Sequence, residues 1–296
     1  MRSSCNYQVA PQGAERSSKM NRVEKLNEEL KRRGAEFTVR EHEKWVNGVY
    51  YKGLMLWSRQ NNINPIIYDA EILTDAEIDT AVDKLIRFHE MTAEPPIEYE
   101  EMMNPDWFRK HLTIRLYSSR AKEHFAKEQV VYRDCLDMAM ALYVFIPCSD
   151  EYSECGAAVH YDVLEELELT EQEAFEIAKK NIEKEVVYRS MELMMGELLT
   201  GEKMEFNEVD EEGMNVLTNT QRMYGAVGIL TESIQKKLEG KWIIPSSVHE
   251  CIILPNTIPL ETCETILKEV NDKQLQPEEV LSYSVYWIQD GKLTRA

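Results

Sequence analysis

A short polar segment between two apolar stretches holds the residue types that could do chemistry. It contains Ser246, Ser247, His249 and Glu250, and Cys251 follows directly. A serine hydroxyl within reach of the His249 imidazole would form the nucleophile–base pair of a hydrolase. In the alternative interpretation the segment is a hairpin turn, where serine side chains bond to free backbone groups and His249 fills a half-buried position. These four residues are therefore candidate catalytic residues, with a structural turn as the other hypothesis.

Motifs of other enzyme chemistries do not occur in the sequence. It contains no glycine-rich phosphate loop, no HExxH helix and no GxSxG nucleophile elbow. Its 6 cysteines include no CxxC pair, which argues against a zinc ribbon. We therefore predict no cofactor and no metal site, and the lack of a complete catalytic motif favours a protein that is not an enzyme.

The charge balance indicates which partners the chain can bind. Asp and Glu number 53 against 34 for Lys and Arg, so the formal net charge is −19. Such a surface repels phosphate backbones and anionic membranes, which argues against direct nucleic-acid binding. The same field attracts basic proteins, including the basic grooves of nucleic-acid enzymes. The alternative is that the acidity serves solubility alone.

The sequence also bears on the cellular setting. No apolar run reaches the length of a membrane span, and no apolar core follows Arg2 as a signal peptide would require. We therefore expect a cytoplasmic protein, and Met20 is a candidate for its natural start. The oligomeric state is left open.

The first part of the chain predicts a small α+β domain after a disordered tail. Residues 1–19 are polar and poor in bulky apolar side chains. A helix is expected over residues 21–33, where apolar residues recur at helical spacing. Asn47-Gly48 is a strong signal for a tight hairpin, because both turn positions need positive φ. The expected order over residues 20–92 is helix, three-strand meander, helix.

Two further signals concern the second helix of this domain and the boundary after it. Thr74 and Glu77 have the spacing of a capping box before an amphipathic stretch. Residues 93–118 contain several prolines and glutamates, so we predict a linker or connecting segment there.

Residues 119–296 predict a larger domain, a mostly antiparallel sheet with helices packed on it. A capping box at Thr170 predicts a helix, whereas residues 190–213 are predicted to form a partly ordered acidic excursion. Thr218 or Asn219 is expected to cap another helix. The apolar stretches on either side of the polar segment predict two strands of a hairpin. The predicted fold class is α+β for both domains.

Several segments of this domain resemble an uncharacterised family, a domain of unknown function found in Gram-positive gut anaerobes and often encoded on mobile elements. The matching segments are Arg133–Asp137, Val216–Asn219, Tyr224–Ala226, Ile244–Glu250, Glu269–Asn271 and Glu278–Ser282, followed by Val285-Tyr286. Cys251 departs from the pattern, where an apolar residue is more usual. The resemblance implies a bacterial protein, a fold and a genomic setting, but no activity.

Two function hypotheses follow. The first is a non-catalytic cytosolic protein-binding protein with an acidic surface, such as a mobile-element accessory factor or an inhibitor of a basic nucleic-acid enzyme. The alternative is a hydrolase that uses Ser246 or Ser247 with His249.

Overall fold

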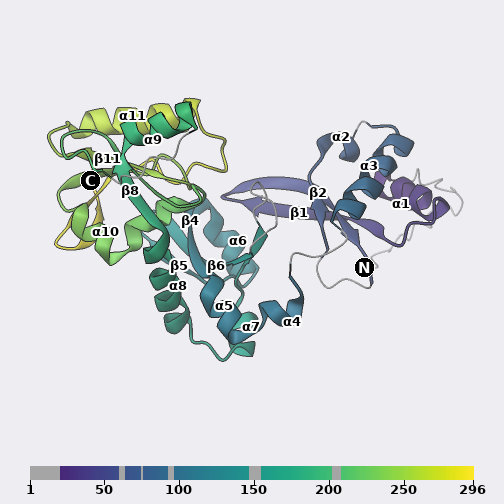
Figure 1. Cartoon of the computed structure of the whole chain (residues 1–296). Coiled ribbons are helices and arrows are strands. Elements are labelled where there is room, and N and C mark those ends of the chain that lie inside the picture. The colour runs from purple at the N-terminus through teal and green to yellow at the C-terminus, as the bar shows by residue number, and fades with distance from the viewer. Residues whose placement is uncertain (1–20, 60–63, 75, 93–96, 147–154, 202–207) are drawn as a thin grey trace, which may run out of the picture. The chain divides into compact units, whose positions relative to one another are not determined.

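A computed structural model describes residues 21–59, 64–74, 76–92, 97–146, 155–201 and 208–296 (Figure 1). Its helices and antiparallel sheets confirm the predicted α+β class. The chain divides into two compact units, the first made of residues 1–42 and 53–93 and the second of residues 43–52 and 94–296. Within the described residues, no helix combines the length and apolar character that a membrane crossing requires. The predicted disordered tail lies outside the described residues.

The first unit is a small sheet covered by helices, in the predicted order except for one additional short helix, α2. Its elements are α1 (Arg22–Arg32), β1 (Thr38–Val46), β2 (Val49–Trp57), β3 (Ile66–Ile67), α2 (Ala70–Leu73) and α3 (Ile78–Met91). The strands pair in the order β1-β2-β3. Figure 1 shows α1 and α3 next to each other in this unit. The core between helices and sheet is apolar and contains Leu26, Leu30, Val39, Leu54, Leu56, Ile72 and Leu85.

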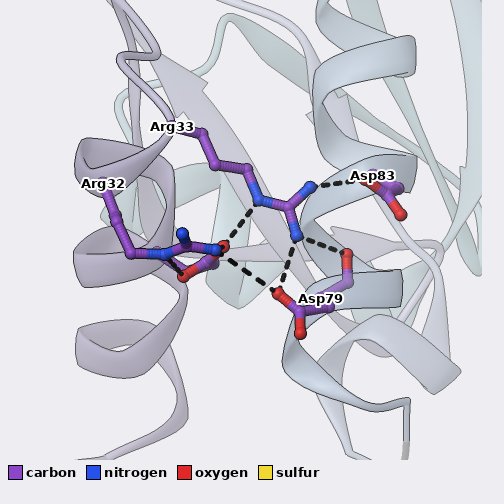
Figure 2. Close-up of polar contacts among 5 residues, drawn as sticks. Arg32, Arg33, Asp79 and Asp83 are labelled. Atoms are coloured by element: carbon purple, nitrogen blue, oxygen red, sulfur yellow. Dashed lines mark hydrogen bonds and ion pairs between the residues drawn. The ribbon is translucent and has the colours of Figure 1, made fainter.

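An ion network on the surface of this unit joins α1 to α3 (Figure 2). The Arg33 Nε lies 2.6 Å from the Glu29 carboxylate, its Nη2 lies 2.8 Å from Asp79, and its Nη1 bonds to Asp83. Arg32 also bonds to Glu29. These hydrogen bonds lower the pKa of Glu29 to about 2. The bond from Arg32 has the largest effect, and the bond from Arg33 has the next largest.

The two long helices of this unit, α1 and α3, are capped differently at their N-termini. Asn21 and Glu24 form a capping box at the start of α1. The capping box predicted at Thr74 and Glu77 is wrong, because α3 begins at Ile78 with Glu77 as its N-cap, and Glu77 makes no side-chain capping bond. The helix is stabilised instead by burial of its apolar face in the core.

The hairpin tip, residues 43–52, belongs to the second unit. Asn47 and Gly48 have φ values of 49° and 87°, as the tight-turn signal predicts. The Asn47 side chain is buried and donates from Nδ2 to the carbonyls of Glu278 (2.8 Å) and Val280 (2.7 Å). Its Oδ1 accepts from the N–H of Ser118. The turn therefore also serves as a tertiary anchor.

The second unit begins with an antiparallel sheet in which β6 pairs with β4, β5 and β7. The strands are β4 (Leu112–Ser118), β5 (Tyr132–Cys135), β6 (Met138–Ile146) and β7 (Cys155–Ala158). The helices around them are α4 (Tyr99–Met102), α5 (Pro105–His111), η1 (Ser119–Ala121), α6 (Lys122–Lys127), α7 (Tyr161–Glu166) and α8 (Glu171–Glu185). Phe125 of α6 packs on one face of the sheet, and Phe175 of α8 lies in the core on the other.

Residues 105–118, predicted as part of a linker, form α5 and β4 of the second unit instead. Leu112, Ile114 and Leu116 are at most 1% exposed. The three intervening residues of β4 are also buried or half-buried, so the strand lacks the clear alternation of a half-solvated strand. The boundary between the units therefore lies before α4.

A six-stranded antiparallel sheet, in the order β13-β12-β10-β11-β9-β8, completes the second unit. Its strands are β8 (Val186–Ser190), β9 (Asn215–Asn219), β10 (Lys241–Ile244), β11 (Cys251–Pro255), β12 (Tyr286–Gln289) and β13 (Lys292–Arg295). The helical elements are α9 (Met191–Thr200), η2 (Gly225–Leu230), α10 (Glu232–Lys237) and α11 (Leu260–Lys273). Leu267 of α11 packs on one face against Ile244, and Ala226 of η2 lies in the core of the other.

Two predictions for this region are wrong. Residues 191–200, predicted as part of an irregular excursion, form α9, because Met194 and Glu197 are buried against the sheet. Thr218 and Asn219 do not cap a helix but end β9, which pairs with β8 on one side and β11 on the other. Strand pairing with two neighbours outweighs the local capping preference.

Candidate functional site

The polar segment after β10 forms a compact turn whose serine side chains bond to backbone. The Ser246 Oγ donates to the carbonyl of Glu250 at 3.1 Å. The Ser247 Oγ accepts from the N–H groups of His249 (3.0 Å) and Glu250 (3.2 Å). Both serines are buried, at 3% and 6% exposure. Within the described residues, neither hydroxyl bonds to the His249 imidazole.

Both nitrogens of His249 face other groups. Nδ1 accepts the N–H of Tyr224 at 3.1 Å, and Nε2 lies 3.7 Å from a Glu279 carboxylate oxygen. Because Nδ1 is an acceptor, the neutral ring carries its proton on Nε2, on the side of Glu279. Burial lowers the pKa of His249, and the Glu279 charge opposes that shift. The neutral imidazole therefore positions the backbone of Tyr224.

Glu250 and Cys251 complete the candidate segment without forming a reactive pair. Burial raises the pKa of the Glu250 carboxyl, while the Arg222 charge opposes that rise. The Cys251 thiol is fully buried, and burial raises its pKa far above the ordinary value. A buried thiol with a raised pKa is a poor nucleophile.

The loop after β9 lies against His249 and is held in a strained conformation. Arg222 and Tyr224 have φ values of 57° and 53°, in the left-handed region. The Asn219 side chain accepts from the N–H of Met223 (3.1 Å) and donates to its carbonyl (2.7 Å). A Cβ on Gly225 would lie 2.4 Å from the Asn219 backbone nitrogen, so this close approach requires glycine. These contacts restrict the conformation of the loop 219–225.

A buried ion cluster holds the middle of this loop. Arg222 forms an ion pair with Glu197. The Glu197 carboxylate also accepts hydrogen bonds from both terminal nitrogens of Arg189. The Glu197 and Arg189 side chains are each only 7% exposed. The cluster ties α9 and β8 to the loop, because its three residues come from these three elements.

A second buried arginine lies behind Tyr224. The Arg115 guanidinium carbon sits 3.3 Å from the ring centre of Tyr143 and 3.7 Å from that of Tyr224. Arg115 as a whole is only 7% exposed. Burial raises the pKa of both tyrosines, so they stay neutral and their rings stack on the cation.

A cavity of about 100 Å³ opens beside this cluster. Most of its lining comes from β4 with the end of α5, from the end of α8 and from the loop 219–225, and Phe145, Val186 and Val227 complete it. Within the described residues, no group of three His, Cys, Asp or Glu side chains could hold a metal ion.

Residues that the sequence predicted as candidates thus lie close to residues that the sequence did not single out. His249 was a candidate, whereas Arg115, Tyr224 and the cavity carry no recognisable motif. The available signal was the resemblance, since three of its segments, Val216–Asn219, Tyr224–Ala226 and Ile244–Glu250, converge here.

The comparisons with known proteins name a family but no activity. No curated protein and no solved structure matches the chain. Residues 19–289 match a family of unknown function, DUF5688. This match spans nearly all of both units and confirms the resemblance to an uncharacterised family. The chain therefore belongs to DUF5688, a family of unknown function.

Proposed function

We propose that the chain is a non-catalytic cytoplasmic binding protein whose acidic surface takes a basic protein partner. The observation that carries the proposal is the state of His249. Its Nδ1 accepts the Tyr224 N–H, and its Nε2 faces Glu279. A general base needs a free lone pair within reach of the nucleophile, and the serine hydroxyls of this turn bond to backbone instead.

The surface around α4 and α7 supports the acidic part of the proposal. Six carboxylates lie on or next to these helices: Glu98, Glu100, Glu101, Asp162, Glu165 and Glu166. None of them forms an ion pair with a residue that the structure describes. Tyr99 and Tyr161 are 38% and 40% exposed among them, and the Tyr99 hydroxyl lies 3.4 Å from Glu166. Exposed tyrosines within a charged rim are common features of protein interfaces.

The partner class follows from charge. A protein with a basic groove, such as a nucleic-acid enzyme of the host or of a mobile element, has the complementary field. In that setting the chain acts as an inhibitor or accessory factor. Nucleic acid itself is repelled by a net charge of −19.

A pull-down from host lysate at low salt tests the proposal. Capture of basic proteins is expected to fall as salt rises, because screening shortens the reach of surface charges. Neutralising the six carboxylates to Gln and Asn should abolish capture. A matched variant with six exposed carboxylates of the first unit neutralised should retain it. Capture that ignores both salt and the variant would overturn the proposal.

An ester-hydrolysis assay tests the hydrolase alternative in parallel. We expect no hydrolysis above that of the Ser246→Ala/Ser247→Ala and His249→Gln variants. Turnover by the unaltered chain that both variants lose would favour the hydrolase and contradict a non-catalytic role.

A further inference from the structure

The cavity beside Tyr224 has a local charge opposite to that of the chain. Its lining includes the cations Lys110 and Arg115 together with His111, and a single carboxylate, Glu185. The chain as a whole carries 53 acidic against 34 basic residues. A basic concavity attracts small anions, because its low-dielectric walls focus the field of its cations.

The outer edge of β4 supplies hydrogen-bonding groups to the same cavity. The Leu112 carbonyl accepts from Asn181 Nδ2 at 2.9 Å, and the Ser118 N–H bonds to Asn47. Both groups therefore face away from β6. Backbone groups alternate along an antiparallel strand, so those of Ile114 and Leu116 face the same way.

Ile114 lines the cavity and is 1% exposed. Its outward N–H and C=O have no hydrogen-bond partner within the part of the chain that the structure describes. Buried backbone groups of this kind are nearly always paired with protein, water or a ligand. The cavity wall thus presents one donor and one acceptor side by side.

The remaining lining is mixed, and its apolar part is rigid. Tyr224, Met223 and Phe145 contribute apolar surface. The loop that carries Tyr224 and Met223 is held by Asn219 and by His249. A wall of fixed shape loses little conformational entropy when a ligand binds.

We propose that this cavity binds a small carboxylic acid that also carries a hydrogen-bond donor, the chemical class of amino and hydroxy acids. The carboxylate accepts from the Ile114 N–H and is attracted by Lys110 and Arg115. The amino or hydroxyl group donates to the Ile114 carbonyl. The cavity volume of about 100 Å³ restricts the ligand to a few heavy atoms beyond these groups. The inference is independent of the acidic surface and of its protein partner.

Titration of the full chain with a panel of small acids, followed by amide NMR, tests this proposal. The panel contains glycine, alanine, serine, lactate and glycolate, with alaninamide and lactamide as uncharged counterparts. We expect saturable shifts of the Ile114, Asn219 and Tyr224 amides with at least one acid, and none with its amide.

Two variants distinguish binding in the cavity from binding elsewhere. Lys110→Gln should weaken binding by about tenfold, since a charge that attracts the carboxylate is lost. Lys127→Gln, on an exposed lysine outside the cavity, should leave affinity unchanged. Met223→Trp, at a partly exposed position, should block binding while the melting temperature stays the same. The proposal would be overturned if no acid of the panel gave saturable shifts. It would also be overturned if Lys110→Gln and Met223→Trp bound the acid as tightly as the unaltered chain does.

Discussion

The two units differ in where their polar side chains lie. Among the described residues, every buried polar or charged side chain belongs to the second unit, including Asn47, Arg115, Arg189, Glu197 and Asn271. The first unit has an apolar interior and places its charges in the exposed network around Arg33 (Figure 2). Both units are mixed helix and sheet, so the contrast concerns what stabilises each fold rather than its class.

This contrast indicates that the first unit is a scaffold and that the second unit is where a binding site can form. Surface ion pairs contribute little to stability and are screened by salt. Buried polar groups cost free energy unless they are paired, so they persist only in an arrangement that satisfies them together. The second unit pairs Arg189 with Glu197 and stacks Arg115 between tyrosines. One of these tyrosines, Tyr224, has a left-handed backbone and lines the cavity. Polar groups that can meet a ligand therefore concentrate in the second unit.

The largest effect that tests this contrast is expected for Glu197→Ala. Removing the carboxylate leaves the Arg189 guanidinium buried without its charged partner, at a cost of about 3–5 kcal/mol in the free energy of unfolding. Urea unfolding read by hydrogen exchange in β8 and β9 peptides measures the loss. Glu192→Ala, on an exposed residue of the same helix, is the control and should cost far less. A loss below about 1 kcal/mol for Glu197→Ala would mean that the buried pair does not organise the second unit.

A smaller effect is expected for Asn47→Ala. Alanine meets the strain of a φ of 49° and leaves Ser118, Glu278 and Val280 without the side-chain partner, so about 2–4 kcal/mol should be lost. Asn47→Gly removes the same hydrogen bonds but adopts this φ without strain, and should cost about 1 kcal/mol less. Hydrogen exchange of β4 amides measures the loss of stability in both variants. Equal losses in the two variants would show that backbone strain does not matter at this turn.

The smallest effect is expected for Arg33→Met in the first unit. The network lies at the surface, so the fall in melting temperature should be small and should vanish near 1 M salt, where the Debye length is about 3 Å. Its contribution also depends on pH. The pKa of Glu29 is lowered to about 2, so this stabilisation is present above its ordinary pKa and is lost as pH falls towards 2.

Hydrogen exchange of α1 and α3 peptides, measured across pH and salt, checks this prediction. Lys25→Met, on the same helix but outside the network, is the matched control. A loss in Arg33→Met that persists in high salt would mean that the first unit depends on a buried electrostatic contact as the second does.

Local features of the fold could be predicted from the sequence because they depend on neighbouring residues. The Asn47-Gly48 turn, the capping box of Thr170 with Glu173 and the paired strands β10 and β11 all form as predicted. Each depends on φ preferences, on side chains three residues apart, or on a short hairpin. The predictions failed at β4, α9 and the end of β9, where burial against distant segments decides the structure.

The candidate site divides in the same way. The sequence by itself determined which residues could do chemistry, including His249 and the two serines, and the acidic charge of the chain. Only the tertiary structure decided what they do, since His249 meets Tyr224, 25 positions earlier, rather than a serine in its own turn. The cavity likewise needs Arg115, Asn181 and Tyr224 from three separate elements. Hydrogen-bond partners inside a fold are set by which groups are buried together, and that juxtaposition is absent from any local pattern.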